Sequence, residues 1–222
     1  MEPKIYIGIP TMTGFAHNKI FMAMWHWGRN YKLTVCFLEG AAPVDSARNI
    51  LVKRFLETDC THLLFIDDDI VPPKHALGQM LEADKDVVSP VCFMPSKEGE
   101  NGIIKPASFV RSDSVCGFDY RYSNKLEKVD VVTGGCFLIK REVFEKIKRP
   151  FSFDYDEDGI LVRTEEFTFA AKVRAAGFQL YTDYTLVCRH KRLFDLAEIN
   201  EYLNKVRNSL EKGEEECNLK LL

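Results

Sequence analysis

The sequence lacks the features that mark several classes of protein. It has no run of 18 apolar residues and no signal-peptide pattern at its start, so we expect a cytoplasmic protein without a transmembrane segment. Its 7 cysteines are scattered with no C-x-x-C pair, which argues against a disulfide framework or a zinc site. The formal net charge is only -3, whereas a nucleic-acid-binding face is strongly basic. We therefore expect no nucleic-acid partner.

Apolar runs and helical patterns alternate along the first 93 of the 222 residues, and no internal repeat or linker interrupts the chain. This alternation predicts an α/β fold with a mostly parallel sheet and helices on its faces. Strands are expected at 5–10, 33–38, 62–66 and 86–91, and helices at 17–30, 44–58 and 72–83.

After residue 93 the pattern changes. Polar loops and short antiparallel strands are expected through residue 119. Further strands are expected at 127–132, 136–139 and 178–187, helices at 141–147, 164–176 and 194–212, and a loop at 150–159. The second half therefore adds a small antiparallel part to one domain.

Three consecutive carboxylates follow an uninterrupted apolar strand. The run Leu-Leu-Phe-Ile leads directly into Asp67, Asp68 and Asp69. In open α/β sheets ligands bind outside the carboxyl ends of the strands. Neighbouring anions are best tolerated beside a cation, and Mg²⁺ and Mn²⁺ prefer carboxylate oxygens, often together with substrate phosphates. We predict a divalent ion held between Asp67, Asp69 and a diphosphate; a solvated Asp-rich turn is the alternative.

An acidic pair and a late histidine offer further functional groups. Thr164 can cap a helix whose first turn contains Glu165 and Glu166, where the helix dipole favours negative charge. Beside a bound substrate, such a carboxylate can also take a proton from an attacking hydroxyl. His190 follows the last expected strand and can bind Mn²⁺, although a lone histidine is more often a packed or surface residue.

These three features in this order resemble the metal-dependent glycosyltransferases of the GT-A fold, especially family 2-like enzymes. Asp67-Asp68-Asp69 matches the family's D-x-D motif, which implies that Asp69 binds the metal and Asp67 the metal or the nucleotide ribose. Glu165-Glu166, followed by Phe169, Lys172 and Gly177, matches the acidic pair of inverting members. The second acid is usually Asp and serves as the base; here it is Glu166, one methylene longer. His190 matches a histidine that completes the metal shell.

Weaker matches extend the resemblance over roughly residues 4–192. They imply a nucleotide-binding loop, an acid that reads the nucleobase, an arginine facing the nucleotide, and a small-residue turn near the donor sugar. The corresponding residues are Pro10 and Thr11, Glu39, Arg48, and Gly134 with Gly135.

The resemblance implies a metal-dependent enzyme that moves a sugar from a nucleoside-diphosphate sugar to an acceptor hydroxyl, with inversion. Mn²⁺ or Mg²⁺ would be the metal, and the acceptor a glycan, a lipid, a protein or a small metabolite. The single domain, residues 1–222, would then comprise a nucleotide-binding half (1–93), an acceptor and catalytic half (94–192), and a C-terminal helix and tail (193–222).

Two alternatives remain open. The string Asp67-x-Asp69-x-Val71 also fits the first motif of aspartate-nucleophile phosphohydrolases, and Ser89 could serve as their second motif. The sequence has no clear later lysine and acidic pair of that class. A nucleotide- or sugar-binding module that has lost its activity is the other alternative.

Overall fold

A seven-stranded sheet forms the centre of the computed structural model, which describes residues 2–40, 42–95, 104–112, 117–191, 200, 204 and 207. Five of its strands point in one direction, and β10 and β11 run antiparallel to them. The expected α/β class with a mostly parallel sheet is confirmed. In spatial order the strands are β10 (Leu126–Val129), β14 (Leu180–Val187), β5 (Val87–Val91), β11 (Cys136–Lys140), β3 (His62–Ile66), β1 (Lys4–Thr11) and β2 (Lys32–Glu39).

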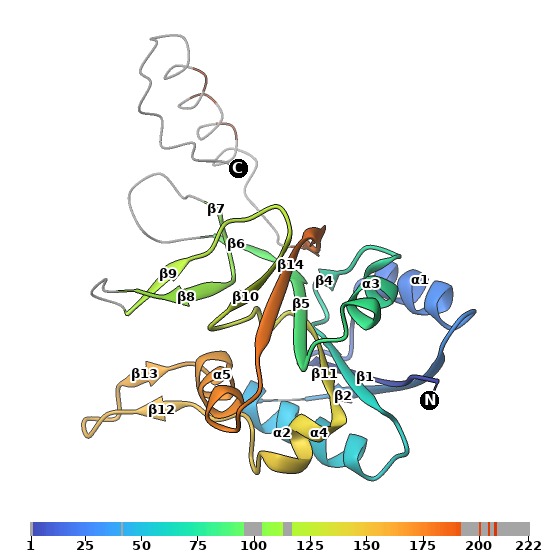
Figure 1. The fold of residues 1–222 in the computed structure, drawn as a ribbon, viewed down its shortest axis with the longest axis horizontal. Helices are drawn as coiled ribbons and strands as arrows, with labels where there is room; N and C mark the ends of the chain where they lie inside the picture. The colour runs from blue at the N-terminus through green and yellow to red at the C-terminus, as the bar shows by residue number, and fades with distance from the viewer. Residues whose placement is uncertain are drawn as a thin grey trace.

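Helices cover both faces of this sheet (Figure 1). Helices α1 (Asn18–Trp27) and α3 (Ala76–Ala83) pack on one face, and α2 (Val44–Leu56), α4 (Arg141–Lys146) and α5 (Glu165–Ala175) on the other. Successive side chains of a strand point to opposite faces. In β3, Leu64 and Ile66 therefore join the core beneath α1 and α3, while Leu63 and Phe65 join the core beneath the other three helices.

The helix expected from residue 72 begins only at Ala76. A residue that precedes a proline is held away from the helical region, so Pro72, which precedes Pro73, cannot open the helix. Just before the prolines the chain forms a short strand, β4 (Ile70–Val71), which pairs antiparallel with β15 (Arg189–His190). This pairing brings the end of the acidic turn next to the late histidine.

Short antiparallel pairs follow β5, as expected. They are β6 (Phe93–Pro95) with β7 (Ile104–Pro106), and β8 (Phe109–Arg111) with β9 (Phe118–Tyr120). The loop expected at 150–159 is partly wrong, because β12 (Asp154–Tyr155) and β13 (Leu161–Arg163) form a hairpin there. The turn between these strands contains Gly159 with φ of 78°.

The helix expected at 194–212 lies outside the described residues, apart from residues 200, 204 and 207, which are helical. Within the described part of the chain, every helix is too short or too polar to cross a bilayer.

Candidate functional site

The functional residues converge at the edge of the sheet where the parallel strands end. Asp67 directly follows β3, and its backbone N–H donates to the carbonyl of Gly135, which precedes the antiparallel strand β11 (2.9 Å). Strand β15 brings His190 opposite Ile70. The topology therefore gathers residues from the first and second halves of the chain, as the sequence predicts.

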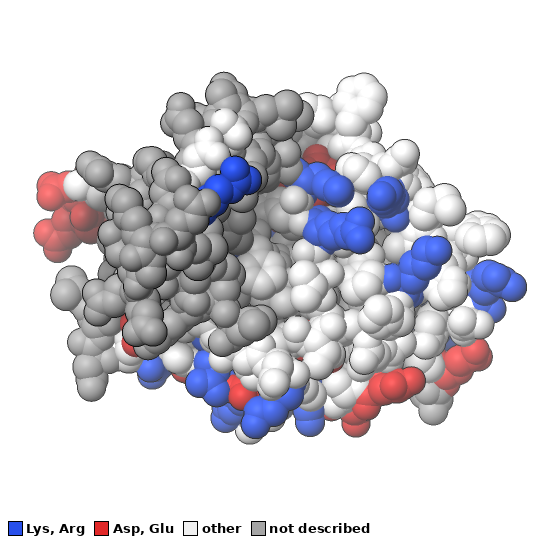
Figure 2. Space-filling model, turned by 90° about the horizontal axis from the view of Figure 1, so that it is seen from above, with Lys and Arg blue, Asp and Glu red and all other residues white. Residues whose placement is uncertain are grey.

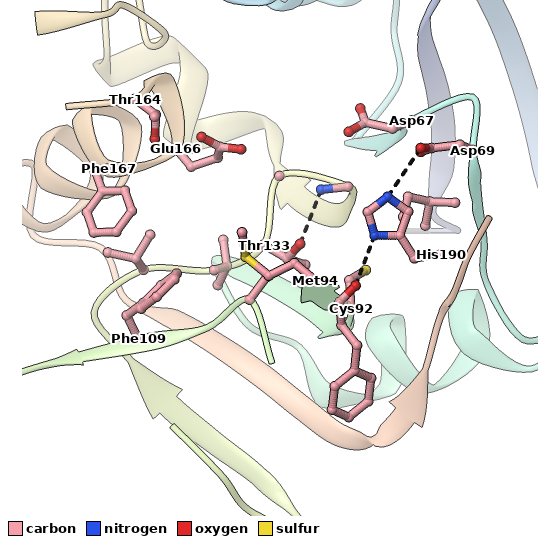
Figure 3. Close-up of a pocket in the computed structure, with 17 residues that line it drawn as sticks. Asp67, Asp69, Cys92, Met94, Phe109, Thr133, Thr164, Glu166, Phe167 and His190 are labelled. Carbon is pink, nitrogen blue, oxygen red and sulfur yellow. Dashed lines mark hydrogen bonds and ion pairs between the residues drawn. The ribbon is translucent and has the colours of Figure 1, made fainter. Parts of the chain in front are cut away.

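Two cavities meet at this edge and share Asp67 and Asp69. The first, of 340 Å³, is drawn in Figure 3. Its lining includes Asp67, Asp69, Cys92, Met94, Phe109, Thr133, Gly134, Gly135, Thr164, Glu166, Phe167 and His190. The second, of 280 Å³, is lined by Pro10, Thr11, Met12, Ala42, Val44 and Asp67, Asp68 and Asp69.

Asp69 and His190 form a close pair on one side of the first cavity. His190 Nε2 lies 3.2 Å from Asp69 Oδ2, and Nδ1 lies 2.9 Å from the carbonyl oxygen of Phe93. Because a carbonyl only accepts hydrogen bonds, Nδ1 must carry the proton, and Nε2 is the nitrogen turned to the carboxylate. A histidine that donates one N–H to a carbonyl and presents the other nitrogen is typical of metal ligands.

The donor set fits a hard divalent cation only in part. Among the described residues, no group of three His, Cys, Asp or Glu side chains is arranged to hold a metal ion. Asp67 lies in the same cavity, but Arg48 Nη2 contacts its carboxylate at 3.3 Å. Asp69 and His190 are thus two side chains of the chain that could hold such an ion. Mg²⁺ and Mn²⁺ accept such sites because water and substrate phosphates complete their coordination.

Arg48 connects the acidic turn to α5 from a buried position in α2. Only 1% of this residue is exposed, and its guanidinium packs over the rings of Phe137 and Phe151, 5.7 and 5.8 Å from their centroids. Nη1 donates to Glu165 Oε1 (2.7 Å), and Nη2 donates to the carbonyl of Gly134 (2.9 Å) as well as contacting Asp67. Arg48 lines neither cavity, and its contacts link the acidic turn to the start of α5; that it faces the nucleotide stays a prediction.

The two glutamates of the acidic pair have different surroundings. Glu165 is buried, 4% exposed, and pairs with Arg48. Burial, followed by the charge of Glu166, raises the pKa of Glu165 to about 7, although Arg48 opposes this shift. The side chain of Glu166 is 29% exposed and lines the first cavity. Figure 3 shows it across the cavity from Asp69 and His190. Glu166 is therefore the member of the pair that a substrate can reach.

The shifted pKa of Glu165 makes a pH-dependent contribution to stability. Between about pH 4.5 and pH 7 the carboxyl of Glu165 keeps its proton in the folded state and loses it in the unfolded state. The free energy of unfolding therefore falls as pH rises through that window. The amide of Glu165→Gln cannot ionise, so the variant does not share this pH-dependent loss. The unfolding free energy of the variant minus that of wild type should therefore rise by on the order of 3 kcal/mol from pH 5 to pH 8. Urea denaturation at both pH values measures this difference.

Glu142→Gln is the matched control, since Glu142 lies in the first turn of α4 and is exposed. The expected gain should be absent from this variant. A Glu165→Gln protein that loses stability relative to wild type as pH rises would show that Arg48 holds the carboxylate ionised.

Gly134 leaves room for Glu166. A Cβ at this position would lie 2.6 Å from Glu166 Oε1 and 2.9 Å from Arg48 Nη1. At Gly135 a Cβ would lie 2.9 Å from Ile70 Cγ1. All three distances are shorter than real Cβ contacts, so a side chain at either glycine would displace Glu166, Arg48 or Ile70 from its observed position.

The other predicted site residues lie in different places. Pro10, Thr11 and Asp68 line the second cavity. Glu39, paired with Thr11 across β1 and β2, lines neither cavity, and its carboxylate lies beside Gly14. Sequence reasoning missed Thr133 and Phe167, which line the first cavity, because no motif marks them.

Comparison with known proteins identifies the family. Residues 28–148, more than half of the chain, match the family model described as "Glycosyl transferase family 2". No curated protein matches. The solved structure of A197 from STIV has a TM-score of 0.56 at 22% identity and covers 86% of each chain. That of GalNAc-T7 with UDP, GalNAc and Mn²⁺ has a TM-score of 0.52 at 12% identity and covers 86% of this chain but 43% of that one.

The matched region contains Arg48, the acidic turn and the Gly134–Gly135 turn, and the structural similarity extends over most of the chain. The chain therefore belongs to glycosyl transferase family 2 and has the GT-A fold of glycosyltransferases.

Proposed function

We propose that this glycosyltransferase is metal-dependent, uses a nucleoside-diphosphate sugar as donor, and transfers the sugar with inversion. The observation that carries the proposal is the placement of Glu166 on one side of the first cavity and the Asp69–His190 pair on the other. This arrangement leaves space between a proton acceptor and a cation site, which is where a donor sugar and an acceptor hydroxyl would meet.

Asp69 and His190 are the residues that would hold Mn²⁺ or Mg²⁺. The bound ion would act as a Lewis acid that stabilises negative charge on the departing diphosphate. The surplus of negative charge supports a cation here, since Asp67, Glu165 and Glu166 lie around one guanidinium and Asp68 and Asp69 follow directly. The solved structure of GalNAc-T7, which shares the fold, contains UDP and Mn²⁺. This supports the proposal that a nucleoside diphosphate and a divalent cation bind together in this chain.

The second cavity supports a nucleotide site beside the cation site. It is lined by Pro10 and Thr11 at the end of β1 and by the three aspartates. A diphosphate bound between the two cavities would place the sugar in the first one. The role of Arg48 would be to hold Asp67 and the start of α5 in position.

Glu166 would serve as the general base. As the acceptor oxygen bonds to the anomeric carbon, the bond from that carbon to the diphosphate oxygen breaks, and the hydroxyl proton passes to Glu166. Attack on the face opposite the leaving group inverts the anomeric centre. Holding both substrates in one cavity supplies much of the remaining rate enhancement.

A nucleotide screen tests the proposal. UDP, GDP, CDP and ADP are each added with Mn²⁺ or with EDTA, and the melting temperature is measured. We expect one nucleotide to raise the melting temperature only when Mn²⁺ is present. A sugar conjugate of that nucleotide should then be cleaved, with release of the nucleotide, when an acceptor is added. Stabilisation that EDTA leaves unchanged would contradict the metal site.

The phosphohydrolase alternative has less support. Ser89 is fully buried, its hydroxyl is hydrogen-bonded to that of Thr182 (3.2 Å), and it lines neither cavity.

The division into nucleotide-binding and acceptor halves and the cytoplasmic location stay predictions. The described cysteines, which are all free, support a reducing location.

Gly134→Ala should displace Glu166 and slow transfer. Its Cβ would lie within 2.7 Å of Glu166 Cγ, so the base must move from its position over the turn. A misplacement of about 1 Å can cost about a hundredfold in rate. We expect kcat to fall by about this factor while the nucleotide still stabilises the protein with Mn²⁺.

Gly28→Ala is the matched control. Gly28 has φ of -62°, and a Cβ there would meet nothing closer than 3.4 Å. A Gly134→Ala enzyme with wild-type kcat would mean that Glu166 need not occupy its observed position.

A further inference from the structure

The outer face of α1 is apolar and exposed. Its inner face is buried against the sheet, as expected for a surface helix: Ile20, Ala23, Met24 and Trp27. The outward side chains of Phe21, Met22 and Trp25 are nevertheless 47%, 54% and 67% exposed. With about 100° between successive residues, these three positions fall on one face. A helix that is apolar on both sides has a second surface to bury.

This surface continues onto the flanking segments. The ring of Phe21 stacks on that of Phe37 in β2, with centroids 5.4 Å apart. β2 is the last strand of the central sheet. We name the whole surface the α1–β2 patch, formed by Met12, Phe15, Phe21, Met22, Trp25, Val35 and Phe37, which are 38–80% exposed. Phe21 and Phe37 join α1 to β2, and exposed apolar side chains gathered on neighbouring segments are typical of an interaction site.

The charged side chains on α1, just after it and at the start of β2 are positive, whereas the carboxylate of Glu39 lies beside Gly14 at the other end of the patch. The chain contains 33 Asp and Glu, yet residues 12–38 contain none and include Lys19, Arg29 and Lys32. The guanidinium of Arg29 lies over the ring of Trp25, 5.8 Å from its centroid. Seen from above, the right side of the molecule shows separate Lys and Arg side chains in its upper part and Asp and Glu side chains along its lower margin (Figure 2). The patch thus combines aromatic rings with positive charge.

We propose that the α1–β2 patch docks onto an anionic phospholipid surface. Aromatic and long apolar side chains enter the headgroup region of a bilayer, and Lys and Arg are attracted by anionic lipids. A second copy of the chain fits less well, because an interface built from the same patch on both copies would bring Lys19 and Arg29 of each close together. This docking goes beyond the proposed function and does not depend on sugar transfer.

Docking through this patch would place the donor-side cavity near the lipid headgroups. Met12 belongs to the patch and also lines the 280 Å³ cavity. The loop that precedes α1 is fixed to the acidic turn, since the backbone N–H of His17 donates to the carbonyl of Asp68 (2.9 Å). The patch and the cavity therefore hold a fixed relation to each other.

Co-sedimentation of the full chain with vesicles tests the proposal. We expect the protein to pellet with equimolar phosphatidylcholine and phosphatidylglycerol, less so as salt rises, and to stay in solution with phosphatidylcholine alone. Phe21→Ser with Trp25→Ser should weaken the partition coefficient by about tenfold or more. Lys19→Gln with Arg29→Gln should weaken it roughly twenty-five-fold, at about fivefold per charge.

The control is Ile160→Ser with Val162→Ser, which removes two side chains that are 63% and 58% exposed on the β12–β13 hairpin. It should bind vesicles like wild type, and thermal unfolding checks that every variant folds. Equal binding by the α1 variants and wild type would overturn the proposal. So would a lipid-free dimer in sedimentation velocity that Phe21→Ser with Trp25→Ser dissociates, because the patch would then bind a second copy.

Discussion

Glu166→Gln is expected to reduce kcat for sugar transfer by about 10²–10⁴-fold, the range that general-base catalysis supplies. The amide keeps the size of the side chain and its place in the first cavity, but it cannot accept the acceptor's proton. Donor binding should change little, because Asp69, His190 and the second cavity stay intact. Steady-state kinetics with a saturating donor, together with Mn²⁺-dependent nucleotide binding, measures both quantities.

Glu165→Gln separates the base from its neighbour. Glu165 is buried against Arg48, so its substitution should alter stability with pH more than it alters proton transfer. A Glu166→Gln enzyme with unchanged kcat would remove the base assignment. A larger loss in Glu165→Gln than in Glu166→Gln, with both proteins folded, would reverse the two roles.

The sequence predicted those parts of the site that local pattern determines. An apolar strand of four residues followed by Asp67, Asp68 and Asp69 needs only the rule that ligands bind at the carboxyl ends of strands. The start of α5 was also predictable from local sequence, because Thr164 at the N-cap position is followed by two acidic residues in the first turn. Gly177, with φ of 87°, marks its end.

Contacts between distant segments were not predictable in this way. Arg48 and Glu165 are 117 positions apart, and their ion pair depends on how α2 and α5 pack on one face of the sheet. The family resemblance implies that Arg48 faces the nucleotide, and no local signal in the sequence shows that its guanidinium packs over the rings of Phe137 and Phe151. The antiparallel insertion of β11 between β3 and β5 likewise depends on long-range pairing.

The distinction between Glu165 and Glu166 also required the structure. Adjacent residues on a helix point about 100° apart, so Glu165 and Glu166 have different surroundings. Which one faces the first cavity is decided by the rotation of α5, which Phe169, Ala170 and Val173 fix by burial in the core. The sequence located the pair, and packing separates a buried partner of Arg48 from a residue that a substrate can reach.

Asp69→Asn is expected to abolish Mn²⁺-dependent nucleotide binding and to lower transfer by about a thousandfold, because a metal contributes several kcal/mol of charge stabilisation. The amide is nearly the same size as the carboxylate but carries no charge for the cation. His190→Gln should have a similar effect, since its ring nitrogen faces Asp69 Oδ2 at 3.2 Å. Nucleotide-induced thermal stabilisation and kcat/KM, each at varied Mn²⁺ concentration, measure the losses.

A double-mutant cycle makes the test specific. If Asp69 and His190 hold one ion, the second substitution should cost little once the first has removed the ion, so the two losses should not add. Asp84→Asn is the matched control: it removes a carboxylate at the C-cap of α3, where φ is 48° and asparagine is tolerated. Additive losses, or full Mn²⁺ dependence in Asp69→Asn, would show that the two side chains do not share a cation, and the metal site would then have to be sought elsewhere along the acidic turn.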